Sequence, residues 1–512
     1  MCVCGRRQFL GSTAVLAGAA ALDSAGTATA AEAPAPAPTA EQDHTLALIH
    51  ATLLAAPGVR PPEHDATVLV RGDRVVATGP TAQLQVPPGA RVVDLTGKHV
   101  IPGLIDAHAH SGGPEGVHPP LYPLLGVTTV REMWGTPTVR AWRDKVNAGR
   151  LLGPRWVIAS TIVDSPPGLW TSDIWPVPTI EVRTDAEARS TVRRIRAEGA
   201  DFIKVYSRLT REAYFALADE ALRWGVPFAG HCPDAVTVSD ASDAGQHSVE
   251  HLHPLLLSTS SKEEEIRRRL DAVRVNPRDP STMSRVRGWF HAVHDLESAA
   301  TRSYDPGRAH RLFDRLAANG TYVTPTLVTH HTMERPETLP SSDPEWTYLP
   351  RRQTAAWPAQ LKELTGERTP EESAHLRDVN AHRTRLVGEM RRRGVPVLAG
   401  TDTGTSYLVP GFALHHELRR LTEAGLTPAQ ALQAATVEPS RALGTATEAG
   451  TVEPGKAADL VVLDADPLHD IRNTLRIDSV LTRGRLIDAA ERRRLLAEVA
   501  EAAAAATPPA RT

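Results

Sequence analysis

Six residues of this sequence have the side chains and the spacing that a metal centre requires. Four are histidines, one is a lysine and one is an aspartate: His108, His110, Lys204, His231, His251 and Asp402. Side chains two positions apart on a strand share a face, so His108 and His110 can chelate one ion together. Four imidazoles and a carboxylate suit Zn²⁺ and, less specifically, manganese, iron or cobalt.

Each of these residues also has an ordinary structural interpretation. A His-x-His pair is often incidental, His251 could be a polar residue with local partners, and Asp402 could cap a helix. Lys204 could be the partner of a buried acid. The joint placement of all six favours the metal centre, because every one of them stands at the end of a predicted strand.

The strands that must position these residues alternate with amphipathic helices such as Asp185–Glu198 and Arg211–Trp224. The predicted strands are His99–Asp106, Val127–Arg131, Trp156–Ser160, Phe202–Val205, Pro227–Gly230, Ser248–Val249, Tyr322–Leu327 and Val395–Gly400. This α/β alternation over residues 99–445 predicts a (β/α)8 TIM barrel, whose C-terminal strand ends meet at one mouth. Helical insertions of about 70 and about 65 residues are expected after the sixth and seventh strands.

The barrel region is flanked by segments that read as short strands. Residues 44–98 and 446–490 contain alternating apolar and polar residues interrupted by Gly and Pro. We expect these two pieces to meet in one composite β-sandwich domain formed from both chain ends. Residues 491–512 are predicted to form a C-terminal helix and a tail.

Residues 1–30 have the pattern of a twin-arginine-type signal peptide. Arg6-Arg7 precedes the short apolar run Ser12–Leu22, and Ala28-Thr29-Ala30 matches an A-x-A cleavage site. A general secretory signal or a membrane anchor are the alternatives, but the run is short for a transmembrane helix. We therefore expect a secreted or periplasmic protein, exported by the twin-arginine machinery and without stable membrane insertion after cleavage. Residues 31–43 are predicted to be a disordered linker.

The composition narrows the classes of partner. The net charge is −3 and the pI is about 6.7, so no surface for nucleic acid is expected and a small-molecule substrate is favoured. After signal cleavage only Cys232 remains, which excludes an internal disulfide. Lysine is scarce, because the 57 basic residues include only six lysines. The oligomeric state stays open.

Three motifs carry a resemblance to a known family. These are Val100-Ile101-Pro102-Gly103-Leu104-Ile105-Asp106-Ala107-His108-Ala109-His110, then Ala399-Gly400-Thr401-Asp402-Thr403, and finally Glu453-Pro454-Gly455-Lys456-Ala457-Ala458-Asp459-Leu460-Val461-Val462-Leu463-Asp464. They resemble the first-strand motif, the eighth-strand motif and the return into the β-sandwich of the amidohydrolase superfamily. The resemblance extends over residues 44–490 and is closest to imidazolonepropionase-like and prolidase-like members with two metal ions and a carboxylated lysine.

The resemblance implies a role for each of the six residues. His108, His110 and Asp402 would hold the more buried divalent ion, and His231 and His251 the more exposed one, with Zn²⁺ the preferred metal. Lys204, as a CO₂-derived carbamate, would bridge the two ions. Arginine could not replace this lysine, because a guanidinium stays protonated and forms no carbamate.

The implied chemistry is hydrolysis of an amide, that is, of a C–N bond outside nucleic acids. A hydroxide held between the ions would attack the carbonyl, and Asp402 would act as general base and then as general acid. The residual positive charge would stabilise the oxyanion. Dipeptides and N-acyl amino acids are the substrates that the resemblance suggests.

Aromatic residues near the strand ends predict an apolar portion of the substrate; they are Trp134, Trp170, Trp175, Tyr206 and Tyr407. Several relatives have a tyrosine directly before the fifth-strand histidine, where this sequence has Gly230. Tyr206 is therefore the candidate to polarise the scissile carbonyl. Of His330 and His331, one is expected to bind substrate and the other to lie on the surface; we assign substrate binding to Tyr206 and His330.

Three alternative functions remain open at this point. A mononuclear deaminase would use His108, His110, His231 and Asp402 without a bridging lysine, and Asp234 would stand where deaminases have a glutamate. An esterase or lactonase would use the same metal centre on a different bond. A non-catalytic metal-binding barrel is the alternative from another class, and the complete ligand set argues against it.

Overall fold

Strands from both ends of the chain pair in one sheet. The computed structural model describes residues 45–170, 179–276 and 282–506, so the predicted signal peptide and linker lie outside the described residues. The sheet has the order β17-β16-β15-β5-β1-β2-β3, with β4 pairing with β1. Its strands are β1 (Leu46–Leu53), β2 (Glu63–Arg71), β3 (Arg74–Pro80), β4 (Arg91–Asp94), β5 (His99–Pro102), β15 (Leu460–Leu463), β16 (Ile477–Thr482) and β17 (Arg485–Ile487).

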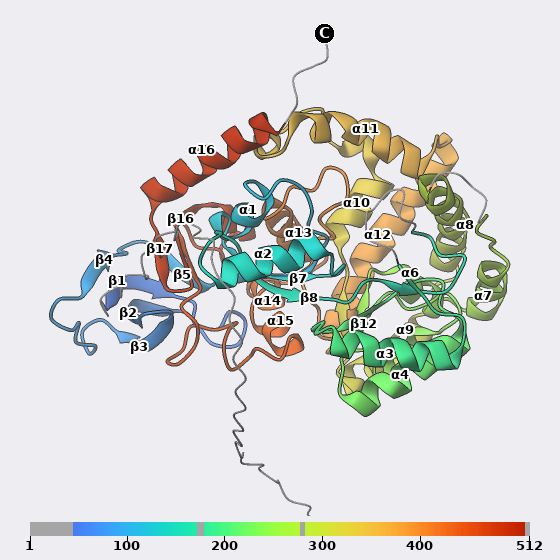
Figure 1. Ribbon diagram of the computed structural model, residues 1–512, viewed down its shortest axis with the longest axis horizontal. Coiled ribbons are helices and arrows are strands. Elements are labelled where there is room, and N and C mark those ends of the chain that lie inside the picture. Colours follow the sequence, from blue (N-terminus) through green and yellow to red (C-terminus); the bar gives the residue numbers. More distant parts are fainter. Residues whose placement is uncertain (1–44, 171–178, 277–281, 507–512) are drawn as a thin grey trace, which may run out of the picture. The chain divides into compact units, whose positions relative to one another are not determined.

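The two ends of the chain meet where β5 and β15 lie antiparallel, with Pro102 opposite Leu460 and His99 opposite Leu463. Figure 1 shows the blue N-terminal strands of this sheet beside the red C-terminal ones. Buried apolar side chains of both ends, among them Leu48, Val100 and Val462, form one core cluster. Burial of these apolar faces stabilises the pairing of segments that are far apart in the sequence.

The predicted strand His99–Asp106 is in fact two strands in two different sheets. β5 ends at Pro102, and β6 (Leu104–Ala109) begins after Gly103 and pairs with β7 in a parallel sheet. A Cβ atom at Gly103 would lie 2.1 Å from Thr128 Oγ1, so the backbone passes too close for any side chain. The prediction of one continuous strand was wrong, because the chain changes sheets at this glycine.

Parallel strands form the middle of the chain, in the order β6-β7-β8 and β10-β9-β11-β12-β13-β14. Beyond β6 they are β7 (Val127–Glu132), β8 (Arg155–Ile158), β9 (Val163–Asp164), β10 (Ile180–Glu181), β11 (Ile203–Val205), β12 (Phe228–Gly230), β13 (Ser248–Glu250) and β14 (Tyr322–Thr324). Single parallel bridges connect further segments: Ala159 with Phe202, Val323 with Val397, and Ala109 with Thr403. The predicted strand Val395–Gly400 is not a regular strand, but it holds the bridge at Val397.

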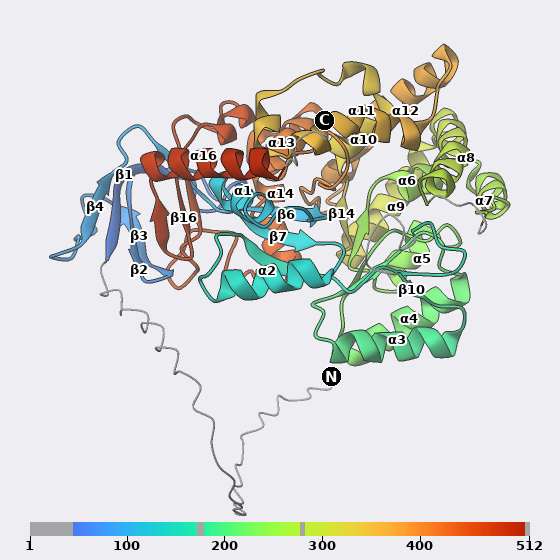
Figure 2. The same cartoon turned by 45° about the horizontal axis from the view of Figure 1, so that its top comes forward.

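Helices follow most of these strands, as the alternating pattern predicts. They are α1 (His118–Leu124), α2 (Pro137–Asn147), α3 (Asp185–Ala197), α4 (Arg211–Trp224) and α5 (Val238–Asp243). The predicted helices Asp185–Glu198 and Arg211–Trp224 are confirmed as α3 and α4, which pack against each other (Figure 2). Thr184 caps α3 through a reciprocal capping box with Glu187, which satisfies backbone donors of the first turn.

Both long insertions are helical in the part that the structure describes. The first contains α6 (His253–Ser258), α7 (Glu263–Asp271), α8 (Thr282–Arg302) and α9 (Pro306–Asn319). The second contains α10 (Leu327–Glu334), η1 (Pro336–Thr338), η2 (Pro344–Tyr348), α11 (Arg351–Thr365) and α12 (Pro370–Arg392). Charged side chains of α8, α10 and α12 meet in the interior of the two insertions, where buried Arg383 of α12 pairs with Glu297 of α8 and Glu334 of α10.

The remaining helices are α13 (Phe412–Glu423), α14 (Pro428–Ala434), α15 (Val437–Ala442), η3 (Ile471–Leu475) and α16 (Ala489–Ala505). The C-terminal helix α16 packs against α1, with Val499 and Ala503 in one apolar cluster with Val117 and Leu121. Among the helices that the structure describes, none combines the length and the apolar character needed to cross a bilayer.

Candidate metal centre

The end of β6 and the segment after Val397 bring two histidines to one carboxylate. His108 lies inside β6 and His110 follows its last residue. The parallel bridge between Ala109 and Thr403 places the Asp402 loop directly beside them. Asp402 Oδ1 lies 3.3 Å from His108 Nε2 and 3.2 Å from His110 Nε2. The two residues of the His-x-His motif therefore face the same carboxylate oxygen.

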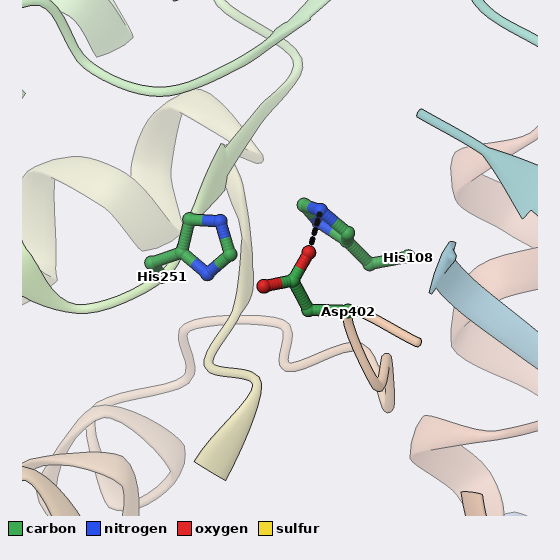
Figure 3. A group of neighbouring side chains, drawn as sticks. All are labelled: His108, His251 and Asp402. Carbon is green, nitrogen blue, oxygen red and sulfur yellow. Dashed lines mark ion pairs between the residues drawn. The ribbon is translucent and has the colours of Figure 1, made fainter. Parts of the chain in front are cut away.

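His251 completes a group whose potential ligand atoms lie within 4.8 Å of one another: His108, His251 and Asp402. Figure 3 shows the three side chains converging, with the carboxylate of Asp402 between the two rings. His251 and Asp402 have backbone φ angles of +65° and +56°, and Thr326, which contacts His251, has +46°. Such conformations are unfavourable for residues other than glycine and concentrate at functional sites.

His231 follows β12 and joins the group through His251. Their ring centroids are 4.9 Å apart. His231 Nδ1 hydrogen-bonds Ser207 Oγ, and His251 Nδ1 hydrogen-bonds Thr326 Oγ1, each at 2.7 Å. With Nδ1 engaged in this way, Nε2 of each ring is the atom left for an ion.

Lys204 lies in the middle of β11 and is fully buried. Among the residues that the structure describes, its Nζ has no hydrogen-bond partner. Burial lowers the pKa of Lys204 to about 8, although the charges of Glu250 and Asp402 act in the opposite direction. A buried amine without a partner is unusual and needs an explanation.

The electrostatics of the group fit a metal ion. Burial lowers the pKa of His231 and of His251 well below the ordinary value, so both imidazoles are neutral and can act as ligands. Burial acts to raise the pKa of Asp402, but the neighbouring imidazoles of His108 and His110 hold it well below its usual range. In the described part of the chain, His108 Nε2 is a further buried atom without a hydrogen-bond partner. The donor set is thus of the type that zinc prefers.

Sequence analysis missed a buried carboxylate beneath this group. Glu250 is the last residue of β13, and its Oε2 lies 2.7 Å from His108 Nδ1. Its Oε1 accepts a hydrogen bond of 2.7 Å from Arg131 Nη2. Burial opposes ionisation, but the charge of Arg131 and the His108 hydrogen bond hold the pKa of Glu250 below its usual range. The only indication in the sequence was that Glu250 stands two residues after Ser248, so that both side chains lie on the same face of a strand.

Asp106 is a second buried carboxylate beside the group that sequence analysis did not assign. Its Oδ1 accepts hydrogen bonds from the backbone N–H groups of His108 and Thr401, and its Oδ2 accepts one from Thr401 Oγ1 at 2.8 Å. Burial raises the pKa of Asp106 to about 6. Asp106 therefore links the strand of His108 to the loop of Asp402. Its place in the first-strand motif was the only indication of this role in the sequence.

The predicted substrate-binding tyrosine lies against the group. The ring of Tyr206 stacks on His231 at a centroid distance of 4.0 Å, and its hydroxyl accepts a hydrogen bond of 2.6 Å from Trp170 Nε1. Gly230 has φ +139°, and a Cβ there would lie 2.2 Å from Val205 O and 3.0 Å from Lys204 Cδ. No tyrosine fits directly before His231, which leaves Tyr206 as the aromatic hydroxyl beside it.

The other predicted substrate contacts form two groups: residues that lie near the histidines of the centre and residues that do not. His330 is buried on α10 with its ring centroid 6.0 Å from that of His251, while His331 hydrogen-bonds Thr338 on an exposed segment. Trp134 packs 6.3 Å from His110 and 5.9 Å from Trp170. Tyr407 instead belongs to an aromatic cluster with Trp346 and Trp357, and Trp175 lies outside the described residues.

Asp234, the residue that a deaminase would need, has structural partners. Its Oδ2 accepts hydrogen bonds of 3.0 Å from Arg208 Nη1 and from Trp289 Nε1 on α8. The carboxylate is thus tied to the first insertion.

Comparisons with known proteins identify a family that this chain matches. The model described as "Amidohydrolase family" matches residues 124–487. A stretch of 96 residues, 19% of this chain, is 33% identical to the adenine deaminase of Moorella thermoacetica and covers 15% of that enzyme. The matched parts span between 14% and 30% of the curated relatives.

Solved structures are similar over nearly the whole chain. A protein from Bifidobacterium longum assigned as a prolidase is 25% identical with a TM-score of 0.60, covering 89% of this chain and 99% of that one. A bottromycin amidohydrolase is 24% identical with a TM-score of 0.68, covering 90% and 91%. These likenesses show that the fold is shared.

Proposed function

This chain belongs to the amidohydrolase family, and on that premise we propose that it is a metal-dependent hydrolase of carbon–nitrogen bonds. The convergence of His108, His251 and Asp402, with ligand atoms within 4.8 Å of one another, is the observation that carries the proposal. Buried Lys204 Nζ, for which no described residue is a hydrogen-bond partner, supports a centre with two ions.

We also propose that the parallel strands close into the predicted (β/α)8 barrel. The bridge between Ala159 and Phe202 joins the strand of β8 to that of β11. The segment around Val397 bridges to Val323 on one side, and Thr403 bridges to Ala109 on the other. These pairings support a ring with the six predicted ligands at one end. The strand pairing of both chain ends supports the predicted composite domain of residues 44–98 and 446–490, to which β5 also belongs, so that the proposed barrel begins with β6 rather than at residue 99.

In the proposed centre His108, His110 and Asp402 would hold one divalent ion, His231 and His251 would hold a second, and Lys204, as a carbamate, would be a ligand of both. When bound, such ions lower the pKa of water and polarise a carbonyl oxygen, and Zn²⁺ fits this donor set. Burial of Lys204 supports the modification, because it disfavours the ammonium form and leaves an amine that can react with CO₂.

The side chains of this chain carry the proton transfers. Asp402 accepts a proton from the attacking water and returns it to the leaving nitrogen, a role for which its ionised carboxylate is prepared. Tyr206 donates its hydroxyl proton as a hydrogen bond to the scissile carbonyl. Trp170 Nε1 occupies a lone pair of the Tyr206 oxygen, so it orients the hydroxyl and leaves the O–H free to donate.

Substrate binding is assigned to His330 together with Tyr206. Trp134 and Trp170 near the centre support an apolar portion of the substrate. A dipeptide or an N-acyl amino acid satisfies these features. The deaminase alternative is disfavoured, because Asp234 is engaged by Arg208 and Trp289.

Zinc-loaded protein is expected to hydrolyse members of a library of dipeptides and N-acyl amino acids, as followed by release of free amine. Removal of metal with a chelator should abolish the activity, and added Zn²⁺ should restore it, since the ions supply the reacting water. Matched esters and adenine serve as controls. Ammonia release from adenine without amide hydrolysis would favour the deaminase, and preferred cleavage of the ester would favour the esterase.

We propose export by the twin-arginine route to a secreted or periplasmic location. Replacing Arg6 and Arg7 together by lysine is expected to leave most of the protein unprocessed in the cytoplasm, because this pathway reads the arginine pair. Fractionation and immunoblotting measure the distribution. The change Arg91→Lys, at an exposed arginine of β4, is the matched control. Full export of the double variant would indicate the general secretory route instead.

A further inference from the structure

Three histidines of the centre use Nδ1 in the same way but with chemically different partners. In each ring Nδ1 is engaged and Nε2 is the atom left for an ion. The partner is a carboxylate for one ring and a hydroxyl for the other two. The pairs are His108 with Glu250, His231 with Ser207 and His251 with Thr326, all at 2.7 Å.

The carboxylate of Glu250 is fixed from both sides. Oε2 hydrogen-bonds His108 Nδ1, while Oε1 accepts from Arg131 Nη2 and from Ser248 Oγ. Glu250 is 1% exposed and Arg131 is 2% exposed, so water does not compete for this ion pair. Glu250 is therefore a buried anion whose position is determined.

Arg131 in turn is anchored by groups from three other strands. Besides Glu250, it donates to the backbone carbonyl of Ala107, the residue that precedes His108. It also donates to Ser248 Oγ at 2.9 Å and to Thr324 Oγ1 at 3.2 Å. Arg131 thus connects β6, β7, β13 and β14 beneath the centre, and its guanidinium keeps Glu250 in register with His108.

A carboxylate and a hydroxyl affect an imidazole differently. A charged acceptor on Nδ1–H fixes the tautomer, orients the ring and makes Nε2 a stronger donor to a metal ion. A neutral hydroxyl orients the ring but adds little electron density. On this basis His108 is the strongest of the three ligands, and its Nε2 is the one 3.3 Å from Asp402 Oδ1.

We propose that Glu250, held by Arg131, is a positioning residue that makes the ion site at His108 the tight one, so that two ions bind with unequal affinity. The inference rests on the proposed metal-dependent function. It attributes the difference in metal affinity between the two sites to the groups that hydrogen-bond Nδ1 of the histidines. It requires no difference in the type of metal ligand.

Zinc titration of the metal-free protein against a chromophoric chelator tests this directly. The unmodified protein is expected to show two classes of site. In Glu250→Gln the tight class should weaken about 10- to 100-fold, the usual effect of losing an outer partner, while the weak class stays unchanged. In Ser207→Ala only the weak class should change. Equal affinities in the unmodified protein, or a Glu250→Gln variant that shifts both classes alike, would overturn the proposal.

The matched control is Glu220→Gln on α4, where a buried carboxylate pairs with Arg193 of α3 rather than with a histidine of the centre. It should leave both affinities unchanged. Circular dichroism of the metal-free variants checks folding, and if Glu250→Gln fails to fold, the unmodified protein and Ser207→Ala still decide. A protein that binds no zinc at all would contradict the proposed function itself, an outcome distinct from two equal sites.

Discussion

Replacing Asp402 by asparagine is expected to reduce kcat about a hundredfold or more, the usual loss when a general base is removed. The substitution conserves shape. It also conserves backbone preference, because Asp402 has φ +56° and asparagine tolerates this left-handed conformation as well as aspartate does. What disappears is the charge that faces His108 and His110 at 3.3 and 3.2 Å. The measurement is steady-state kinetics on a substrate found by the screen, with metal content determined on the same samples.

Asp234→Asn is the informative companion to this variant. Both residues are partly buried carboxylates that follow predicted barrel strands, but Asp234 is occupied by Arg208 and Trp289. Under the proposed mechanism, kcat of Asp234→Asn stays within a few-fold of the unmodified protein once folding is verified. A near-normal kcat in fully metallated Asp402→Asn would exclude Asp402 as the general base. A collapse of kcat in well-folded Asp234→Asn would instead support deaminase-type chemistry.

The strands and helices could be predicted from the sequence because their signals are local. Apolar runs of strand length and the caps of α3 and α4 depend on neighbouring residues only. The boundary at Gly103 could not be predicted this way, since His99–Asp106 reads as one apolar strand. The pairing of β5 with β15 joins residues more than 350 positions apart in the sequence. A local sequence pattern cannot predict a contact of this kind.

The metal-binding candidates were predicted from their common position at strand ends, and the structure brings His108, His251 and Asp402 together. The buried ion pair of Glu250 and Arg131 was not predicted, because most charged residues lie at the surface and a position on a strand does not by itself show that a charge is buried. Left-handed backbone at Asp402, His251 and Thr326 is likewise imposed by tertiary contacts. Tyr407 is the opposite case. Its position near a strand end predicted a contact with the substrate, but its packing against Trp346 and Trp357 accounts for an aromatic residue there without a substrate.

Replacing Lys204 by alanine is expected to remove the bridge between the ions and to cost nearly all activity. The unmodified protein should bind close to two metal ions per chain, about 3.5–4 Å apart as in other two-metal sites. The variant should bind metal poorly, because a carbamate contributes a negative charge and two oxygen atoms that alanine lacks. Lys362→Ala, which changes an exposed lysine paired with Glu367 on the second insertion, should leave metal content and activity unchanged.

The carbamate itself predicts a chemical rescue. Its formation joins the neutral Lys204 nitrogen to the carbon of CO₂ and releases one proton, so reconstitution of the metal-free protein should be faster with added bicarbonate. In Lys204→Ala, a short carboxylic acid such as acetate fits the vacated volume and supplies two oxygen atoms, so it should partly restore both metal binding and hydrolysis. Native mass spectrometry of the intact protein should detect the mass of one added CO₂, lost when the metal is removed. One metal ion per chain with an unmodified Lys204 would overturn the two-metal mechanism and favour the mononuclear deaminase. Of the six lysines in the chain, only Lys204 is assigned to the metal centre, and only a centre with two bridged ions requires it.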